Sequence, residues 1–198
     1  MKCSFYRCSV LAVVIGVLLA ALCPAQSLSP TDARKAVAIE AHAVLEALGH
    51  QQFAALSQYV SADKGVRFSP YASIDKDADV VLTRRDLRSP RKLETVRKWG
   101  AYDGSGQPIQ LSFLAYFRKF VWDRDFARAK VGFNEASGKS NTANNASDVY
   151  PNDIVVEYYV APPSDAEKAA QWSSLRLVFE KTGSDWFLVG IVHDQWTI

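Results

Sequence analysis

Residues 174–197 read SLRLVFEKTGSDWFLVGIVHDQWT, two apolar runs separated by a short polar segment that contains Gly183. Runs rich in Val, Ile, Leu and aromatic residues, bounded by turn residues, are typical of β-strands. The sequence therefore predicts strands over 174–180 and 186–197. Their connection is short enough for an antiparallel hairpin.

The second of these runs is apolar at almost every position. Strict alternation places Leu188 and Val192 on one face of the strand and Val189 and Ile191 on the other. A strand with two apolar faces is expected at the centre of a sheet, covered on both sides. A further strand is predicted over 154–160.

Upstream, the apolar spacing changes to that of helices. Ser29 followed by Pro30 is a good helix start, because the hydroxyl accepts from an early amide and proline fits the first turn. From Ala33 to Leu48, apolar residues recur every three or four positions, which predicts an amphipathic helix that ends near Gly49.

Two shorter helices are expected over 53–60 and, after Ser112 as the capping residue, over 113–121. Helices near the N-terminus followed by antiparallel strands indicate an α+β fold, in which the helices close one side of a curved, mostly antiparallel sheet. We expect a single domain over 26–198.

The region between the helices predicts mixed structure. Residues 65–71 and 80–82 form short extended segments, and Thr83 can cap the polar helical stretch that follows. The sequence Asp-Gly-Ser-Gly over 103–106 predicts a turn.

Residues 1–25 have the pattern of a secretory signal peptide. Lys2 and Arg7 precede an apolar run over 10–22, and Ala25 offers a small residue for cleavage. The run is shorter than the ~20 residues that a membrane-spanning helix needs. The prediction is a secreted or periplasmic protein; an uncleaved membrane anchor is the alternative.

A lipid on Cys23 is a further alternative, which is disfavoured because Leu22 is large where lipoprotein processing requires a small residue. The other two cysteines, Cys3 and Cys8, also lie in the leader, so the mature fold must be stable without disulfides.

Charge argues against two classes of partner. The full sequence has 23 basic and 21 acidic residues, and loss of Lys2 and Arg7 leaves a formally neutral chain. Binding to nucleic acid or to anionic lipid through a large basic surface is therefore not expected.

The order of elements resembles the NTF2-like, or cystatin-like, cone of secreted bacterial proteins. Three runs resemble an uncharacterised family of bacterial exported proteins and lipoproteins: GVRFSPY over 65–71, WGAYDGSGQPI over 99–109, and LRLVF over 175–179 with VGIVHDQWTI over 189–198. The resemblance implies the fold and the compartment, together with the homodimers that are frequent in this superfamily. It supplies no catalytic residues.

The densest polar group on the last predicted strand is His193-Asp194-Gln195. Alternation places His193 and Gln195 on one face, and Asp194 and Trp196 on the other. A buried histidine or carboxylate must be paired or must shift its pKa. His193 or Asp194 facing a cavity without a cationic partner would favour acid–base catalysis, whereas a satisfied ion pair, for example with Arg67 or Arg176, would favour a scaffold role.

A ligand pocket is predicted at the open mouth of the sheet. The extended segment over 65–71 and the glycine turn should both lie there, and the candidate lining residues are Arg67, Tyr71, Trp99, Tyr102, Asp103, Asp194 and Trp196. An aromatic floor with one arginine suits a carboxylate-bearing or sugar-like ligand. Packing of Trp99 and Tyr102 against the turn is the alternative explanation.

Asp75, Asp77 and Asp79 alternate like the first ligands of a calcium loop. The pattern is defective because Val80 occupies the position that requires glycine. A solvated acidic loop is therefore the preferred interpretation, and no metal or other cofactor is expected.

These features favour a noncatalytic domain that binds a small molecule or an envelope protein. The alternative is a small enzyme in which Asp194 or His193 acts as acid and base on an apolar substrate.

Overall fold

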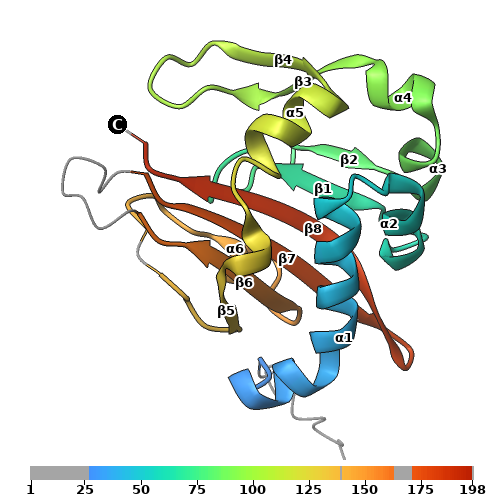
Figure 1. Ribbon diagram of the computed structural model, residues 1–198, viewed down its shortest axis with the longest axis vertical. Coiled ribbons are helices and arrows are strands. Elements are labelled where there is room, and N and C mark those ends of the chain that lie inside the picture. Colours follow the sequence, from blue (N-terminus) through green and yellow to red (C-terminus); the bar gives the residue numbers. More distant parts are fainter. Residues whose placement is uncertain (1–26, 139, 163–170, 198) are drawn as a thin grey trace, which may run out of the picture.

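The computed structural model describes residues 27–138, 140–162 and 171–197 (Figure 1). The predicted signal peptide, residues 1–25, lies outside these ranges. Within them the chain is α+β, with helices packed on a mixed sheet, so the predicted class is confirmed. None of the helices in the described ranges is both long and apolar enough to cross a membrane.

The main sheet has six strands in the order β2-β1-β8-β7-β6-β5. Their bounds are β1 Val66–Ser69, β2 Val80–Leu82, β5 Lys130–Phe133, β6 Ile154–Val160, β7 Ser173–Thr182 and β8 Asp185–Gln195. Neighbours are antiparallel except β1 and β8, which are parallel. The last predicted strand is therefore central, as expected, and pairs with β1 and β7.

The predicted faces of β8 are wrong in part because the hairpin contains a register shift. Val178 pairs with Gly190, but the next residue of β7, Phe179, pairs with Leu188. Val189 is left without a partner, and the extra residue reverses the alternation. Leu188 and Ile191 consequently lie in the same apolar cluster, beneath the helices.

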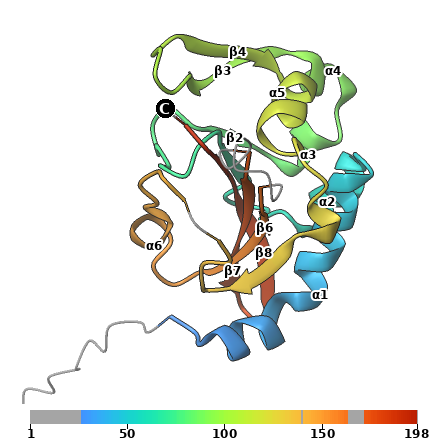
Figure 2. The ribbon, with the colours of Figure 1, turned by 60° about the vertical axis from the view of Figure 1, so that its left-hand side comes forward.

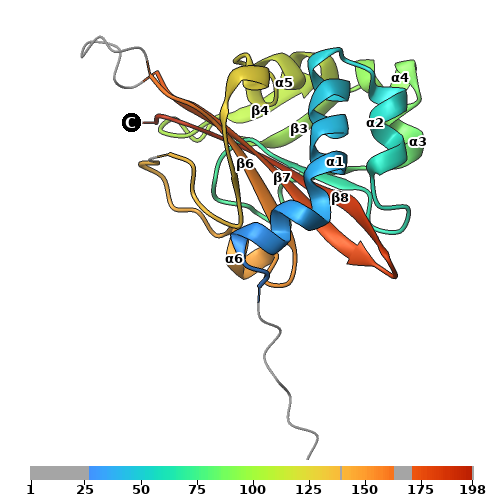
Figure 3. The ribbon, with the colours of Figure 1, turned by 60° about the horizontal axis from the view of Figure 1, so that its bottom comes forward.

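Three helices cover that face: α1 Pro30–Gly49, α2 Phe53–Tyr59 and α5 Phe113–Phe120. Figure 3 shows α1 lying across the strands of the sheet. The predicted caps are confirmed, since the Ser29 hydroxyl accepts from the Asp32 amide and the Ser112 hydroxyl accepts from the Ala115 amide.

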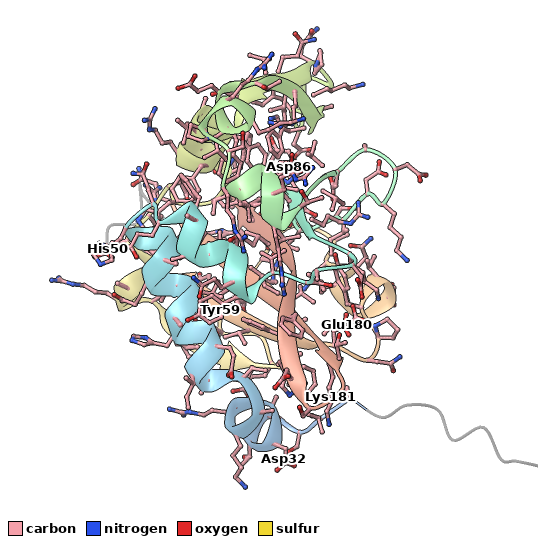
Figure 4. The ribbon with its side chains drawn as sticks, turned by 90° about the vertical axis from the view of Figure 1, so that its right-hand side faces the viewer. Asp32, His50, Tyr59, Asp86, Glu180 and Lys181 are labelled. Atoms are coloured by element: carbon pink, nitrogen blue, oxygen red, sulfur yellow. The ribbon has the colours of Figure 1, made fainter. Side chains whose placement is uncertain are left out.

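A separate two-stranded sheet, β3 Val96–Ala101 with β4 Pro108–Ser112, lies beside α5 (Figure 1). The short helices α3 Arg84–Leu87 and α4 Pro90–Glu94 lead into it, and a 3-10 turn, η1 Phe126–Arg128, follows α5. Thr83 caps α3 through a reciprocal pair of bonds with Asp86, which Figure 4 labels. An aromatic cluster joins this small sheet to the core, because the Trp99 ring stacks on the Tyr116 ring at 4.1 Å between centroids.

The opposite face of the main sheet is covered by loops. Figure 2 shows the sheet nearly edge-on, with α1 and α2 on one side and α6 Ala146–Val149 on the other. Under these loops Val178 and Val192 pack in a second apolar cluster with Ile74 and Ala146.

Candidate functional site

The largest hollow at the end of β8 is a groove of about 600 Å³ that we call the terminal groove. That volume lies in the ~300–1,000 Å³ range of small-molecule sites. It is lined by Tyr71, Ser73, Ala101, Tyr102, Asp103, Gly104, Gly106, Asn141, Thr142, Ala143 and Thr197. The groove thus brings three of the predicted ligand residues, Tyr71, Tyr102 and Asp103, together from two separate loops.

One wall of the terminal groove is aromatic. The Asp103 amide donates to the Tyr71 hydroxyl at 3.2 Å, which joins the extended segment after β1 to the turn between β3 and β4. Both tyrosine rings pack around Phe120 of α5, and the Lys119 ammonium lies 4.4 Å from the centre of the Tyr102 ring. Burial raises the pKa of Tyr71, so its hydroxyl stays protonated and can donate to a ligand.

The opposite wall is the segment 140–143, which is tied to the end of β8. The Asn141 side-chain amide donates to the Thr197 carbonyl at 2.7 Å. The Thr142 hydroxyl donates to the Asp194 carboxylate, also at 2.7 Å. These bonds hold the wall in place. The first bond uses the side-chain nitrogen of Asn141 and does not involve its side-chain oxygen.

Beneath this segment lies a buried charge cluster. One guanidinium nitrogen of Arg176 donates to Glu157 at 2.8 Å and to Asp194 at 3.0 Å, and all three side chains are at most 5% exposed. The Ser174 hydroxyl donates to Glu157 at 2.7 Å, and the Ser137 amide donates to the other oxygen of the same carboxylate. Asp194 therefore has the satisfied ion pair that favours a scaffold role.

His193 faces the opposite side of the sheet and is fully buried. Its Nδ1 lies 3.2 Å from the Pro70 carbonyl oxygen, and its Nε2 lies 3.1 Å from Asp123 and 3.2 Å from the Ser173 hydroxyl. In a serine-hydrolase triad, the carboxylate and the serine must bind different nitrogens of the imidazole. Here both approach Nε2, so the cluster is not arranged for nucleophilic attack by Ser173.

The other predicted ligand residues lie elsewhere. Trp99 is fully buried, and its indole nitrogen donates to the Leu111 carbonyl at 2.8 Å, so the packing explanation holds for this residue. Trp196 is 44% exposed and does not line the terminal groove. Arg67 does not join the aromatic residues, and the prediction that it would is wrong. Phe68 points into the helix-covered core, so its neighbour Arg67 must face the other side of the sheet.

Arg67 lines a second hollow of about 390 Å³, which we call the basic cleft. Its charged residues are Lys64, Arg67, Lys76 and Lys181, opposed by Asp153 and Glu180. Figure 4 labels Glu180 and Lys181, which lie near the end of β7, just before the turn into β8. Lys64 and Glu180 form an ion pair at 2.6 Å.

The acidic loop satisfies its own backbone. The Asp75 carboxylate accepts from the amides of Asp77 and Ala78, and Asp79 accepts from the Ser69 hydroxyl and the Asp75 amide. Burial raises the pKa of Asp79 to about 6. Across the residues that the structure describes, no three metal-ligating side chains gather at one point.

Neither the protein-family models nor the curated proteins include a match to this chain. Among solved structures, it is similar to the 1.8 Å structure of Aln2 from a Streptomyces species, at 11% identity and a TM-score of 0.36, covering 86% of this chain and 94% of that one. A likeness at this level assigns neither a family nor a function.

Sequence reasoning missed several residues of these sites. Asn141 and Thr142 lie in a Ser- and Asn-rich stretch whose composition indicates only a loop. Glu157 and Asp123 lacked a local partner, since each pairs with a side chain far away in sequence. The one available signal was Glu157 itself, a charged residue inside an otherwise apolar predicted strand, which is expected to need a partner when buried.

Proposed function

We propose that this chain is an exported, NTF2-like domain that binds a small neutral polyhydroxylated ligand, such as a sugar, in the terminal groove and catalyses no reaction. The observation that carries the proposal is the pairing of an aromatic wall with a polar one. Tyr71 and Tyr102 offer ring surface, while Asp103, Asn141 and Thr142 offer hydrogen-bonding groups. Sugars present both apolar ring faces and hydroxyl groups, and such a mixed surface suits them.

Charge favours a neutral ligand. The described lining of the terminal groove contains no Lys, Arg or His, and Asp103 is its one acidic residue. A carboxylate-bearing ligand would meet Asp103 without a lining cation to balance it. The sequence suited either a carboxylate-bearing or a sugar-like ligand. Because Arg67 lies apart from the tyrosines, the sugar-like ligand is favoured.

The wall geometry also supports binding. Because Asn141 and Thr142 are already bonded to Thr197 and Asp194, the polar wall requires little ordering when a ligand arrives. The acid–base alternative lacks comparable support, since Asp194 is paired with Arg176 and His193 lies among Pro70, Asp123 and Ser173.

The test is titration of the mature protein, residues 26–198, with a panel of neutral mono- and disaccharides, followed by calorimetry and by amide NMR shifts. We expect saturable binding that shifts the amides of Asp103, Gly104 and Thr142. Asp103→Ala should weaken binding about tenfold or more, the effect of losing hydrogen bonds to a charged group. Asp185→Ala, an exposed carboxylate at the other end of β8, is the matched control and should leave affinity unchanged.

The proposal fails if no sugar of the panel binds saturably, or if the two substitutions have equal effects. Native mass spectrometry of the protein purified from its own envelope fraction tests the compartment at the same time. We expect a mass that begins at Gln26 and carries no lipid. A retained leader, a lipid on Cys23, a protein bound in the groove or a stable dimer through the groove would each contradict part of the proposal.

A further inference from the structure

The basic cleft lies beside the middle and the hairpin end of β8, whereas the terminal groove lies beyond its C-terminal end. It contains four cationic side chains and two carboxylates. One cation, Lys64, is paired with Glu180 at 2.6 Å. The other lining cations are Arg67, Lys76 and Lys181, against the one other lining carboxylate, that of Asp153, so the lining has more cationic than acidic side chains. The carboxylates of Asp75 and Asp79 balance part of the charge of Arg67, and the Lys181 ammonium lies 5.9 Å from the centre of the Trp186 ring.

Arg67 is held rigidly at this site. Its Nη1 donates to the carbonyl oxygens of Asp75, Lys76 and Asp79 at 3.4, 2.9 and 3.3 Å. The guanidinium also lies near the Tyr150 hydroxyl, where its charge opposes the rise in the pKa of Tyr150 that burial causes. The three backbone bonds all use Nη1, and the Tyr150 hydroxyl is a further hydrogen-bond partner of the guanidinium. An arginine fixed in this way is well suited to a planar or trigonal anion, because little side-chain entropy is lost on binding.

The wall of the cleft is apolar. Val81 on the edge strand β2 is 40% exposed, and Val189 and Val149 also line the cleft. Tyr150 lies over Gly190, whose missing side chain makes room for it, since a Cβ there would stand 3.1 Å from the Tyr150 hydroxyl oxygen. Cationic groups beside one exposed valine, Val81, and the more buried Val149 and Val189 provide contacts for a ligand with one charged end and one apolar end.

We propose that the basic cleft is a binding site for a small organic anion, a carboxylate or sulfonate joined to an apolar body, separate from the terminal groove. Arg67 and Lys76 hold the anionic end, and Val81 and Val189 contact the apolar body. This site stands independently of sugar binding in the terminal groove, and either can fail without the other.

The carboxylates of the cleft predict how binding depends on pH. Burial, together with the negative charge of Glu180, raises the pKa of Asp153 to about 6, while the charge of Lys64 opposes the shift. The charges that act on Asp153 are those of Glu180 and Lys64, while Arg67, Lys76, Lys181 and Tyr150 line the same cleft. Asp79, whose pKa burial also raises to about 6, acts on Arg67 and Tyr150. Protonation of Asp153 removes a negative charge from the site, so the anion binds more tightly in acid.

The probe is benzenesulfonate, which stays charged across this pH range, and the readout is NMR of valine methyl groups. We expect shifts at Val81 and Val189, none at the equally exposed Val131 on β5, and an affinity severalfold higher at pH 5 than at pH 7.5. Neutral benzyl alcohol should bind at least tenfold more weakly. Unmoved Val81 and Val189 signals, or equal binding of benzyl alcohol, would overturn the proposal.

Variants separate the contributions of the side chains. Arg67→Lys keeps the charge but loses the planar fork, and should weaken benzenesulfonate about tenfold. Lys76→Ala, at an exposed position, should weaken it severalfold without affecting folding. Arg128→Ala removes a cation that is 91% exposed and outside the cleft, and should change nothing. Asp153→Asn should reduce the pH dependence without removing it, because Asp79, whose pKa burial also raises to about 6, acts on Arg67 in the same pH range. An undiminished dependence in this variant, or an equal loss in Arg128→Ala, would show that the anion binds elsewhere.

Discussion

The Arg176 guanidinium lies 3.0 Å from the Asp194 carboxylate in a site where both side chains are at most 5% exposed, and the same nitrogen also binds Glu157. One buried cation thus serves two buried carboxylates. Because the cluster has an excess of negative charge, its members cannot contribute equally to stability.

Arg176→Met should destabilise the protein far more than Asp194→Asn. Without Arg176, two carboxylates stay buried and unpaired, which we expect to cost about 3–5 kcal/mol. Without the Asp194 charge, the pair of Arg176 with Glu157 remains, and the cost should be only about 1–2 kcal/mol. Urea unfolding measures both, with Arg128→Met as a surface control that should stay within about 0.5 kcal/mol of wild type. Equal losses in the two buried variants would show that charge balance does not govern this cluster.

Asp123 should make stability fall in acid. Burial pushes its pKa up, but hydrogen bonds from His193 and Ser173 and the charge of His193 outweigh burial and lower the pKa below its ordinary value of 3.8. A carboxyl whose pKa is depressed in the folded state adds stability above its unfolded pKa and loses it as the pH falls through its folded pKa. Stability curves from pH 7 to 2 should therefore show a loss below about pH 4 that is smaller in Asp123→Asn. Parallel curves for the two proteins would contradict this assignment.

Tyr116→Phe should stabilise the protein. The Tyr116 hydroxyl is buried and has no hydrogen-bond partner among the residues that the structure describes. Removing an unsatisfied buried hydroxyl while keeping the ring, which stacks on Trp99, should raise the free energy of unfolding by about 1 kcal/mol. Tyr71→Phe is the matched comparison: it removes a hydroxyl that accepts from Asp103 and should cost about 0.5–1.5 kcal/mol. Thermal and urea unfolding should give opposite signs for the two substitutions, and the same sign would refute the interpretation.

Gly65→Ala should be more damaging than Gly104→Ala. Both glycines have positive φ, +69° and +73°, so each alanine carries a conformational cost of about 1–2 kcal/mol. Only at Gly65 would the new Cβ also stand 2.6 Å from the Leu82 carbonyl oxygen; at Gly104 no atom of the described chain lies within 4 Å. The additional clash should add about 1–3 kcal/mol in chemical unfolding, and indistinguishable variants would exclude it.

The elements that the sequence predicted well are those with local signals. Ser29 and Ser112 mark helix starts, and the long apolar runs before and after Gly183 mark the central hairpin. The strands β3 and β5 were missed because few of their side chains are buried, so apolar alternation is weak in them.

The errors arose where geometry depends on distant residues. The unpaired Val189 shifts the register within β8, and no local pattern announces such a bulge. Arg67 was misplaced for a related reason: alternation puts Arg67 and Tyr71 on the same face, but β1 ends at Ser69, and beyond it the chain turns so that Tyr71 packs on Phe120 on the helix side. The residues 140–143 became part of a site only through their bonds to Thr197 and Asp194.

The parallel pairing of β1 with β8 has a consequence for biosynthesis. It places the Pro70 carbonyl beside His193, a residue 123 positions later in the chain. A nascent polypeptide therefore emerges from the ribosome with β1 lacking one of its two neighbours until β8 has been made, and contacts of such long sequence separation form slowly. A delay of this kind would keep the N-terminal half of the polypeptide loosely folded until synthesis is almost complete.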